Sequence, residues 1–145
     1  METNMETNYV SRDKYGMYAG HDGHGHGHGP GPGIMGTDTL VGNDVYNRAD
    51  EDLGDIKDFM VDMATGTIRY AVLSFGGFLG LGDKLFAVPW TALKLDTQNH
   101  RFVLDIKKDA LKDAPGFDKD HWPTMADPTW AQSVHRFYGT TYRAM

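Results

Sequence analysis

Four histidines lie in a glycine-rich stretch near the start of the chain, and their spacing could hold a metal ion. His21, His24, His26 and His28 all fall within the run HDGHGHGHGPGPG, residues 21–33. Imidazole is a good ligand for zinc, copper and nickel, and residues two apart in an extended chain point to the same side. The composition favours a simpler alternative, a flexible tail that binds metal only incidentally, because ordering a glycine-rich chain costs much backbone entropy.

The other residue types argue against catalysis. The chain has no cysteine, which excludes disulfides, thiolate metal sites, iron–sulfur clusters and a thiol nucleophile. No nucleophile elbow surrounds Ser11, Ser74 or Ser133. The glycine loop at residues 75–84 does not fit a phosphate-binding loop, and the acidic run at residues 50–55 does not fit an EF-hand. We therefore predict a non-enzymatic protein without catalytic residues.

Charge and hydropathy limit the classes of partner. The chain has 14 basic and 20 acidic residues, a net charge of −6, and an acidic chain repels phosphate backbones, so we expect no nucleic-acid partner. The longest apolar stretch, Tyr70 to Phe75, is far shorter than the ~18 residues that span a membrane. The first ten residues do not resemble a secretory signal. The default expectation is a cytoplasmic protein, and export by a non-classical route stays open.

The elements that would carry these residues are mostly strands. Short apolar runs alternate with turn residues between residues 39 and 106, and this spacing predicts a small β-barrel or sandwich whose folded part begins near Ile34. The runs lie at residues 40–41, 45–46, 56–61, 68–73, 85–88, 92–95 and 102–104.

Two helices are predicted after the strands. The first covers residues 107–113 and stops before Pro115-Gly116. The second has Asp127 as its N-cap, Pro128 at its first position and Gly139 at its exit. Its apolar stripe consists of Trp130, Val134, Phe137 and Tyr138. The stripe either covers the protein's own barrel or docks on a partner or a second copy.

Four stretches of the sequence resemble the PRC-barrel family, whose domain is shared by the photosynthetic reaction centre H subunit and a ribosome maturation factor. They are residues 53–62, 65–66, 70–90 and 114–118, and the resemblance covers residues 37–123. It implies a mainly β protein with a small barrel, of the kind found as stand-alone bacterial or archaeal proteins. It also implies a binding or assembly module without shared catalytic residues. Residues 1–36 then form a low-complexity N-terminal extension, and residues 124–145 form a C-terminal helix and tail.

The glycine loop that follows the apolar run at residues 68–73 is unusually apolar. Phe75, Phe78, Leu79 and Leu81 cannot all be core residues in so tight a loop. Exposed apolar loop residues often mark an interface. The alternative is that they plug the end of the barrel.

Together these features predict a self-assembling protein whose partners are other copies of itself or another protein. The barrel loop, the C-terminal helix and the terminal segments would form a homo-oligomer, of which a filament is one form. Protonation of the seven histidines near pH ~6.5 would offset the net charge of −6, so such assembly should be pH-sensitive. The alternative is a metal-binding or stress-related protein that uses the histidine tail. An RNA adaptor is the weakest hypothesis.

Overall fold

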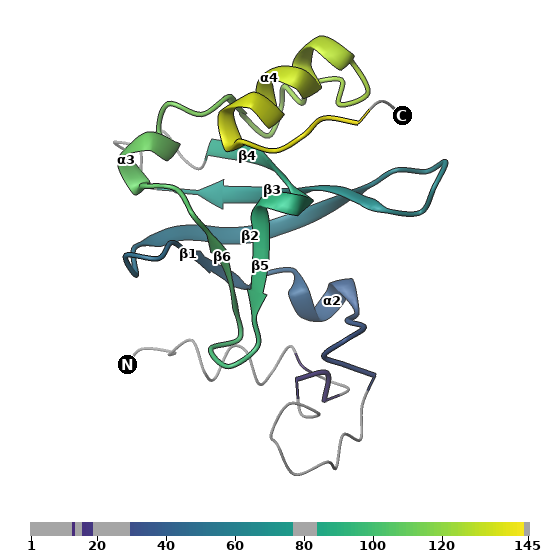
Figure 1. Ribbon diagram of the computed structural model, residues 1–145, viewed down its shortest axis with the longest axis vertical. Coiled ribbons are helices and arrows are strands. Elements are labelled where there is room, and N and C mark those ends of the chain that lie inside the picture. Colours follow the sequence, from purple (N-terminus) through teal and green to yellow (C-terminus); the bar gives the residue numbers. More distant parts are fainter. Residues whose placement is uncertain (1–12, 14–15, 19–29, 77–83, 144–145) are drawn as a thin grey trace.

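The computed structural model describes residues 13, 16–18, 30–76 and 84–143, and within them the protein is mainly β, as predicted (Figure 1). The strands are β1 Asp44–Tyr46, β2 Asp52–Val61, β3 Ile68–Phe75, β4 Lys84–Pro89, β5 Leu93–Asp96, β6 Arg101–Leu104 and β7 Gly116–Phe117. The helices are α2 Thr37–Leu40, α3 Lys108–Leu111, α4 Pro128–Tyr138 and the 3-10 turn η2 Trp90–Ala92.

The strands form one sheet in the order β5-β6-β1-β2-β3-β4-β7. Neighbours are antiparallel except β1 and β6, which run parallel with Val45 opposite Phe102. The register shifts twice between β2 and β3, after Ile56 and after Met60, and such bulges bend a strand and increase its twist. The edge strands β5 and β7 are not paired with each other in the described part of the chain, so the predicted barrel is not closed there.

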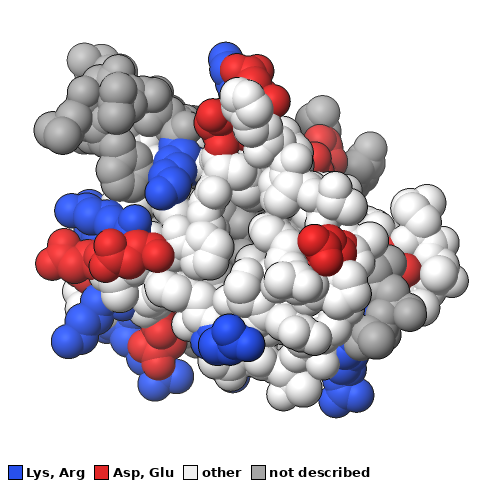
Figure 2. Space-filling model, turned by 90° about the horizontal axis from the view of Figure 1, so that it is seen from above, with Lys and Arg blue, Asp and Glu red and all other residues white. Residues whose placement is uncertain are grey.

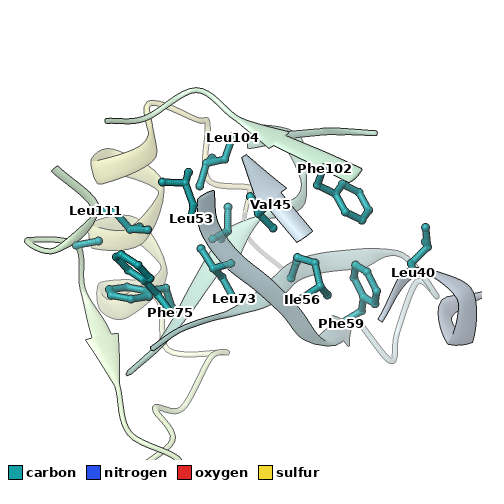
Figure 3. Close-up of a cluster of buried hydrophobic side chains, with 14 residues drawn as sticks. Leu40, Val45, Leu53, Ile56, Phe59, Leu73, Phe75, Phe102, Leu104 and Leu111 are labelled. Carbon is teal, nitrogen blue, oxygen red and sulfur yellow. The ribbon is translucent and has the colours of Figure 1, made fainter. Parts of the chain in front are cut away.

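The main core fills the inside of the curled sheet. Its largest fully buried side chains include Phe86, Phe102, Leu53 and Ile56, which come from three strands, β4, β6 and β2. Figure 3 shows Leu53, Leu73 and Leu104 pointing toward one another from separate strands, with Phe59 and Phe102 facing each other at one end. Burying side chains of this size stabilises a fold by about 1.5–3 kcal/mol each relative to exposure.

Strand β3 is buried on both faces. All residues from Tyr70 to Phe75 are buried, although successive side chains point to opposite sides of a strand. The inner face meets the main core. The outer face is covered by α4, where Tyr70, Ala87 and Val134 form a second buried cluster. The continuous apolar run in the sequence reflects this double burial.

Helix α4 begins and ends where the sequence predicts. The carboxylate of Asp127 accepts a hydrogen bond from the Thr129 amide at 3.1 Å, and Pro128 occupies the first turn. Gly139 ends the helix in the left-handed conformation, with φ of 71°, which glycine adopts without a steric penalty. The helix lies across β3 and β4 in Figure 1.

Two residues of the N-terminal extension are packed against the sheet. Met17 and Tyr18 are both buried. The side-chain amide of Asn43 donates a hydrogen bond to the Tyr18 hydroxyl at 2.8 Å, and the Tyr18 ring lies 4.6 Å from the His100 ring. A β-carbon added at Gly31 would overlap the Met17 carbonyl oxygen, so the chain on either side of residues 19–29 meets at one place.

Two glycines with positive φ provide a matched test of the sheet packing. Gly54 has φ of +114°, and an added β-carbon would overlap the Ser74 carbonyl oxygen on β3, whereas Gly66 has φ of +77° and open space around it. We expect Gly54→Ala to lower the free energy of unfolding by about 2–4 kcal/mol through strain and overlap. Gly66→Ala should cost only about 1 kcal/mol through strain.

Urea unfolding followed by circular dichroism measures both changes. Equal losses of unfolding free energy in the two variants would show that the close approach of β2 and β3 at Gly54 adds nothing to the cost of the substitution.

Candidate functional site

The predicted metal ligands fall outside the described residues. His21, His24, His26 and His28 all lie between residues 19 and 29. Among the residues that the structure describes, no group of three or more histidine, aspartate or glutamate side chains is placed to hold a metal ion. Metal binding by the four histidines therefore stays a prediction.

The predicted interface loop is described only at its start. Phe75 ends β3 and is buried in the main core, with the Lys108 ammonium 5.5 Å from the centre of its ring. Phe78, Leu79 and Leu81 lie outside the described residues. Phe75 thus serves the fold, and the interface role of the other three stays a prediction.

The apolar stripe of α4 packs on the protein's own sheet. Val134 is fully buried, and the Trp130 ring lies 5.3 Å from the Tyr70 ring. Phe137 and Tyr138 are partly buried and pack against the main core. Of the two placements left open for the stripe, it occupies the one on the chain itself. A further role of these four side chains toward a partner stays a prediction.

The Tyr138 hydroxyl of α4 is a buried polar atom. It has no hydrogen-bond partner in the described part of the chain, and its burial raises the pKa of Tyr138. A buried hydroxyl without a partner lowers the free energy of unfolding, so this hydroxyl destabilises the folded protein.

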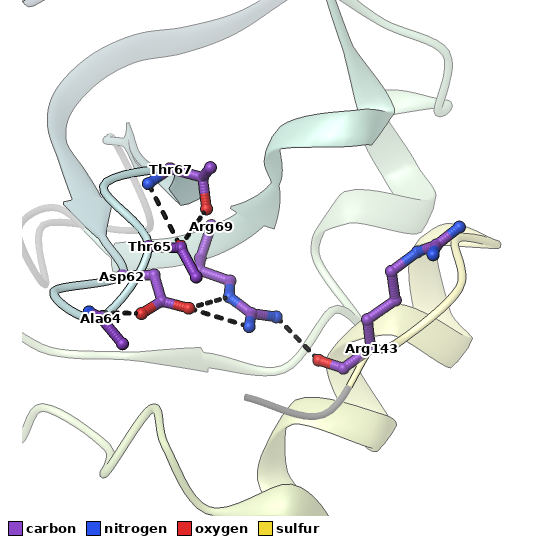
Figure 4. A network of polar contacts seen from close by, with 6 residues as sticks. All are labelled: Asp62, Ala64, Thr65, Thr67, Arg69 and Arg143. Atoms are coloured by element: carbon purple, nitrogen blue, oxygen red, sulfur yellow. Dashed lines mark hydrogen bonds and ion pairs between the residues drawn. The ribbon is translucent and has the colours of Figure 1, made fainter.

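Arg69 is the residue that the sequence reasoning missed. Its Nε and Nη2 donate to one oxygen of the Asp62 carboxylate at 3.1 and 2.9 Å, and its Nη1 donates to the Arg143 carbonyl at 2.7 Å. Figure 4 shows Arg69 between Asp62 of the hairpin and Arg143 of the C-terminal segment. One side chain therefore fastens the end of the chain to the β2–β3 hairpin.

The Asp62 carboxylate is buried at the base of the hairpin turn. The Ala64 amide donates to it at 2.9 Å, and this bond, followed by that from Arg69, holds the pKa of Asp62 below its usual value. Asp62 is thus charged, and both of its carboxylate oxygens accept hydrogen bonds. These bonds fix the orientation of the turn.

Arg69 lines two hollows in the surface beside the hairpin. The first has a volume of about 240 Å³ and walls that are almost entirely apolar. Besides Asp62 and Arg69, it is lined by Met60, Val61, Met63, Tyr70, Met125 and Ala126. Met63 is 88% exposed and Val61 44% exposed, so apolar side chains stand in solvent next to an apolar hollow.

The second hollow has a volume of about 360 Å³ and a more polar wall. It lies between the hairpin, η2, the last turns of α4 and the C-terminal segment. It is lined by Thr65, Thr67, Ile68, Arg69, Trp90, Thr91, His135, Thr141 and Arg143. Among the residues that the structure describes, this lining contains two arginines and no aspartate or glutamate.

His135 holds the C-terminal segment beside this second hollow. It is buried, its Nδ1 lies 2.7 Å from the Thr140 hydroxyl, and its ring lies between those of Tyr70 at 5.8 Å and Tyr142 at 5.7 Å. Burial, followed by the positive charge of Arg69, lowers the pKa of His135. The imidazole is therefore neutral near pH 7.

Ser133 and His135, which lie two positions apart on α4, have different hydrogen-bond partners. The Ser133 hydroxyl donates to the Trp130 carbonyl at 2.7 Å while His135 is bonded to Thr140, so the two do not form a nucleophile–base pair. Figure 2 shows that the face bearing α4 is largely uncharged, with charged side chains gathered toward the end where α3 lies. No helix in the described part of the chain is long and apolar enough to cross a membrane.

Comparison with known protein families identifies the fold. Residues 32–111, more than half of the chain, match the PRC-barrel domain family. A solved structure of the 16S ribosomal RNA processing protein RimM from Pseudomonas aeruginosa is 20% identical, with a TM-score of 0.33. The match covers 48% of this chain and 42% of that one, so the chain spans less than half of RimM. No curated protein matches the chain.

The environment of His135 predicts a loss of stability in mild acid. The folded protein favours the neutral imidazole, whereas the unfolded chain protonates below pH ~6.5. The stability that His135 contributes is therefore present above pH ~6.5 and is lost as the pH falls toward its lower folded pKa. We expect the imidazole signal of His135 to titrate below 6.5 by NMR.

Urea unfolding at pH 7 and pH 5 tests the same point. The natural protein should lose more unfolding free energy between the two pH values than a His135→Gln variant, which cannot be protonated there. An imidazole that titrates above 6.5 would contradict this account.

Proposed function

The chain belongs to the PRC-barrel domain family, and on that premise we propose that it is a non-enzymatic protein-interaction module that assembles with further copies of itself. The observation that carries the proposal is the exposed apolar surface at the hairpin. Met63 and Val61 stand in solvent beside the hollow formed by Met60, Tyr70 and Met125. Exposed apolar surface beside a groove is typical of an interaction site.

This surface is complementary to itself. It offers both exposed side chains and a hollow, so two copies related by a two-fold axis could each insert Met63 into the other's hollow. Two-fold interfaces of this kind are the commonest in homo-oligomers. Methionine suits such a contact, because its flexible, polarizable side chain adapts to irregular gaps.

The charged pair beside the hollow does not oppose such a contact. Asp62 and Arg69 are already bonded to each other and to backbone groups. A partner that covers them would leave neither charge unpaired, which is the condition under which buried charges are tolerated. The pair also keeps the hairpin in one orientation.

The sequence-predicted interface residues would have supporting or additional roles in this assembly. Trp130 packs on Tyr70, which lines the hollow, so α4 supports the contact surface from behind. Phe78, Leu79 and Leu81 would form a second, different contact. A protein with two unlike self-contacts forms a ring or a filament rather than a closed dimer.

A charge placed on the hairpin tests the proposal. We expect the natural protein to have a mass above that of one chain in size-exclusion chromatography with light scattering, in a concentration-dependent way. Met63→Asp should weaken association on the order of 100-fold, because burying a methionine contributes about 1.5–3 kcal/mol and a two-fold contact buries it twice.

The control is Ile34→Asp, which places the same charge on a residue that is 76% exposed and lines neither hollow. It should leave association unchanged. A natural protein that remains monomeric up to millimolar concentration, or equal weakening in both variants, would refute self-assembly through this surface.

A second candidate function is transition-metal binding by the histidine segment, and one observation favours it. The chain on either side of residues 19–29 meets where Met17 and Gly31 lie against each other. His21, His24 and the two histidines that follow thus belong to a segment with joined ends. Joining the ends raises the effective concentration of ligands toward one ion.

Calorimetric titration with zinc, copper and nickel chloride tests metal binding. We expect the combined His24→Ala, His26→Ala and His28→Ala variant to bind at least about tenfold more weakly than the natural protein, because it loses three of the four imidazoles. His121→Ala, an exposed histidine outside the segment, is the control and should bind as the natural protein does. Unchanged affinity in the combined variant would exclude the histidine segment as the site.

A further inference from the structure

The second hollow beside the hairpin has the chemistry of a ligand site that the self-assembly proposal does not use. We propose that it binds a small organic anion, whose carboxylate or phosphate group meets Arg69 and Arg143 while its apolar part lies against Trp90 and Ile68. The proposal is independent of the Met-lined surface, which is a separate hollow sharing only Arg69 with it.

The charge of the hollow is the first support for an anionic ligand. The whole chain has a net charge of −6, yet the described residues that line this hollow include Arg69 and Arg143 and no aspartate or glutamate. Asp62, which forms an ion pair with Arg69, lines the other hollow, so Arg143 is the lining cation that has no paired carboxylate among the described residues. A pocket that excludes acidic side chains in an acidic protein favours a negatively charged occupant.

Both arginines have donors to offer. The guanidinium of Arg69 has five N–H groups, of which one on Nε and one on Nη2 go to Asp62 and one on Nη1 goes to the Arg143 carbonyl. One N–H on each terminal nitrogen is left. The guanidinium of Arg143 makes no ion pair with any described residue, because only its backbone carbonyl takes part in the network. Arginine donors bind carboxylate and phosphate strongly and with defined geometry.

The hydroxyl groups around the arginines extend the polar wall. Thr65 and Thr67 lie on the hairpin, Thr91 on η2 and Thr141 on the C-terminal segment. Figure 4 shows Arg69 facing the Arg143 carbonyl, with the Arg143 side chain extending from there away from Thr65 and Thr67. Polar residues from three parts of the chain thus border the same hollow.

The volume of the hollow and the apolar part of its wall favour an organic anion over an inorganic ion. Its volume of about 360 Å³ lies within the range of small-molecule sites, roughly 300–1,000 Å³. Trp90 and Ile68 form an apolar part of its wall. Small-molecule sites combine such apolar surface with a few placed polar groups.

The wall contributed by the C-terminal segment is already in place without a ligand. Arg69 bonds the Arg143 carbonyl, His135 bonds the Thr140 hydroxyl, and the Thr140 amide donates to the His135 carbonyl at 3.0 Å. A site that is formed before binding avoids the entropic cost of ordering its wall.

NMR titration of the full chain with four probes tests the proposal. Phenyl phosphate and benzoate have an aromatic ring and an anionic group, inorganic phosphate has the charge alone, and benzyl alcohol has the ring alone. We expect the first two to shift the amide signals of Thr65, Thr67 and Thr91 and the indole signal of Trp90. They should bind at least about tenfold more tightly than either of the others, since both parts of the site contribute.

The comparison of phenyl phosphate with benzoate shows which anionic group the site prefers. Benzyl alcohol binding as tightly as benzoate, or no shifts at these residues with any probe at about 20 mM, would overturn the proposal.

Two charge-matched variants locate the anionic group. Arg143→Gln removes the guanidinium and keeps the backbone carbonyl that Arg69 binds, so the C-terminal segment should remain attached. Arg136→Gln removes the same charge from an exposed position of α4 outside the hollow. We expect about a tenfold loss of benzoate or phenyl phosphate affinity for Arg143→Gln and less than about a twofold change for Arg136→Gln.

Equal losses in the two variants would mean that the anion responds to the overall charge and not to this hollow, and would refute the assignment. The oligomeric state is measured in the same samples. A loss of probe binding with unchanged association identifies a failure of this proposal alone.

Discussion

The burial of β3 and β4 on both faces is the constraint on which the rest of the structure depends. The inner face meets the main core, and the outer face exposes Tyr70 and Ala87 unless α4 covers it. The position of α4 in turn determines where the residues before and after the helix lie. Met125, which precedes the helix, forms part of one hollow, and Arg143, which follows it, forms part of the other. Both candidate sites therefore exist because the sheet has an outer apolar face.

Much of the fold could be predicted because its signals are local. Six of the seven apolar runs correspond to strands, and α4 runs from Pro128 to Tyr138 between the predicted cap Asp127 and the predicted exit Gly139. The pattern also predicts a strand at residues 40–41, but Leu40 ends the helix α2. Three elements that were not predicted are short: the four-residue α2, the three-residue η2 and the two-residue β7. Segments of that length have too few residues for a period to be recognised. The open edge between β5 and β7 also has no local signal, since closure depends on pairing between distant strands.

The candidate site could be predicted only in part, because its contacts join distant residues. The stripe of α4 shows that the helix has an apolar face, but not which surface it covers. Arg69 and Arg143 are 74 positions apart, and no spacing rule connects an arginine side chain to a backbone carbonyl at that separation. Tyr18 presents the same difficulty. It stands in a polar, glycine-rich extension, and its burial depends on Asn43, 25 positions further along the chain.

The separation between the sheet and its covering helix has a consequence for biosynthesis. Strand β4 ends at Pro89 and α4 ends at Tyr138. At roughly 5–20 residues per second, the ribosome needs about 2–10 seconds to add the intervening segment. During that interval the nascent sheet can close its inner core while Tyr70 and Ala87 still face water. Partly synthesised chains on one polysome would then expose the same apolar face of the sheet to one another. Slow translation after β4 therefore favours misassembly unless a chaperone covers that face first.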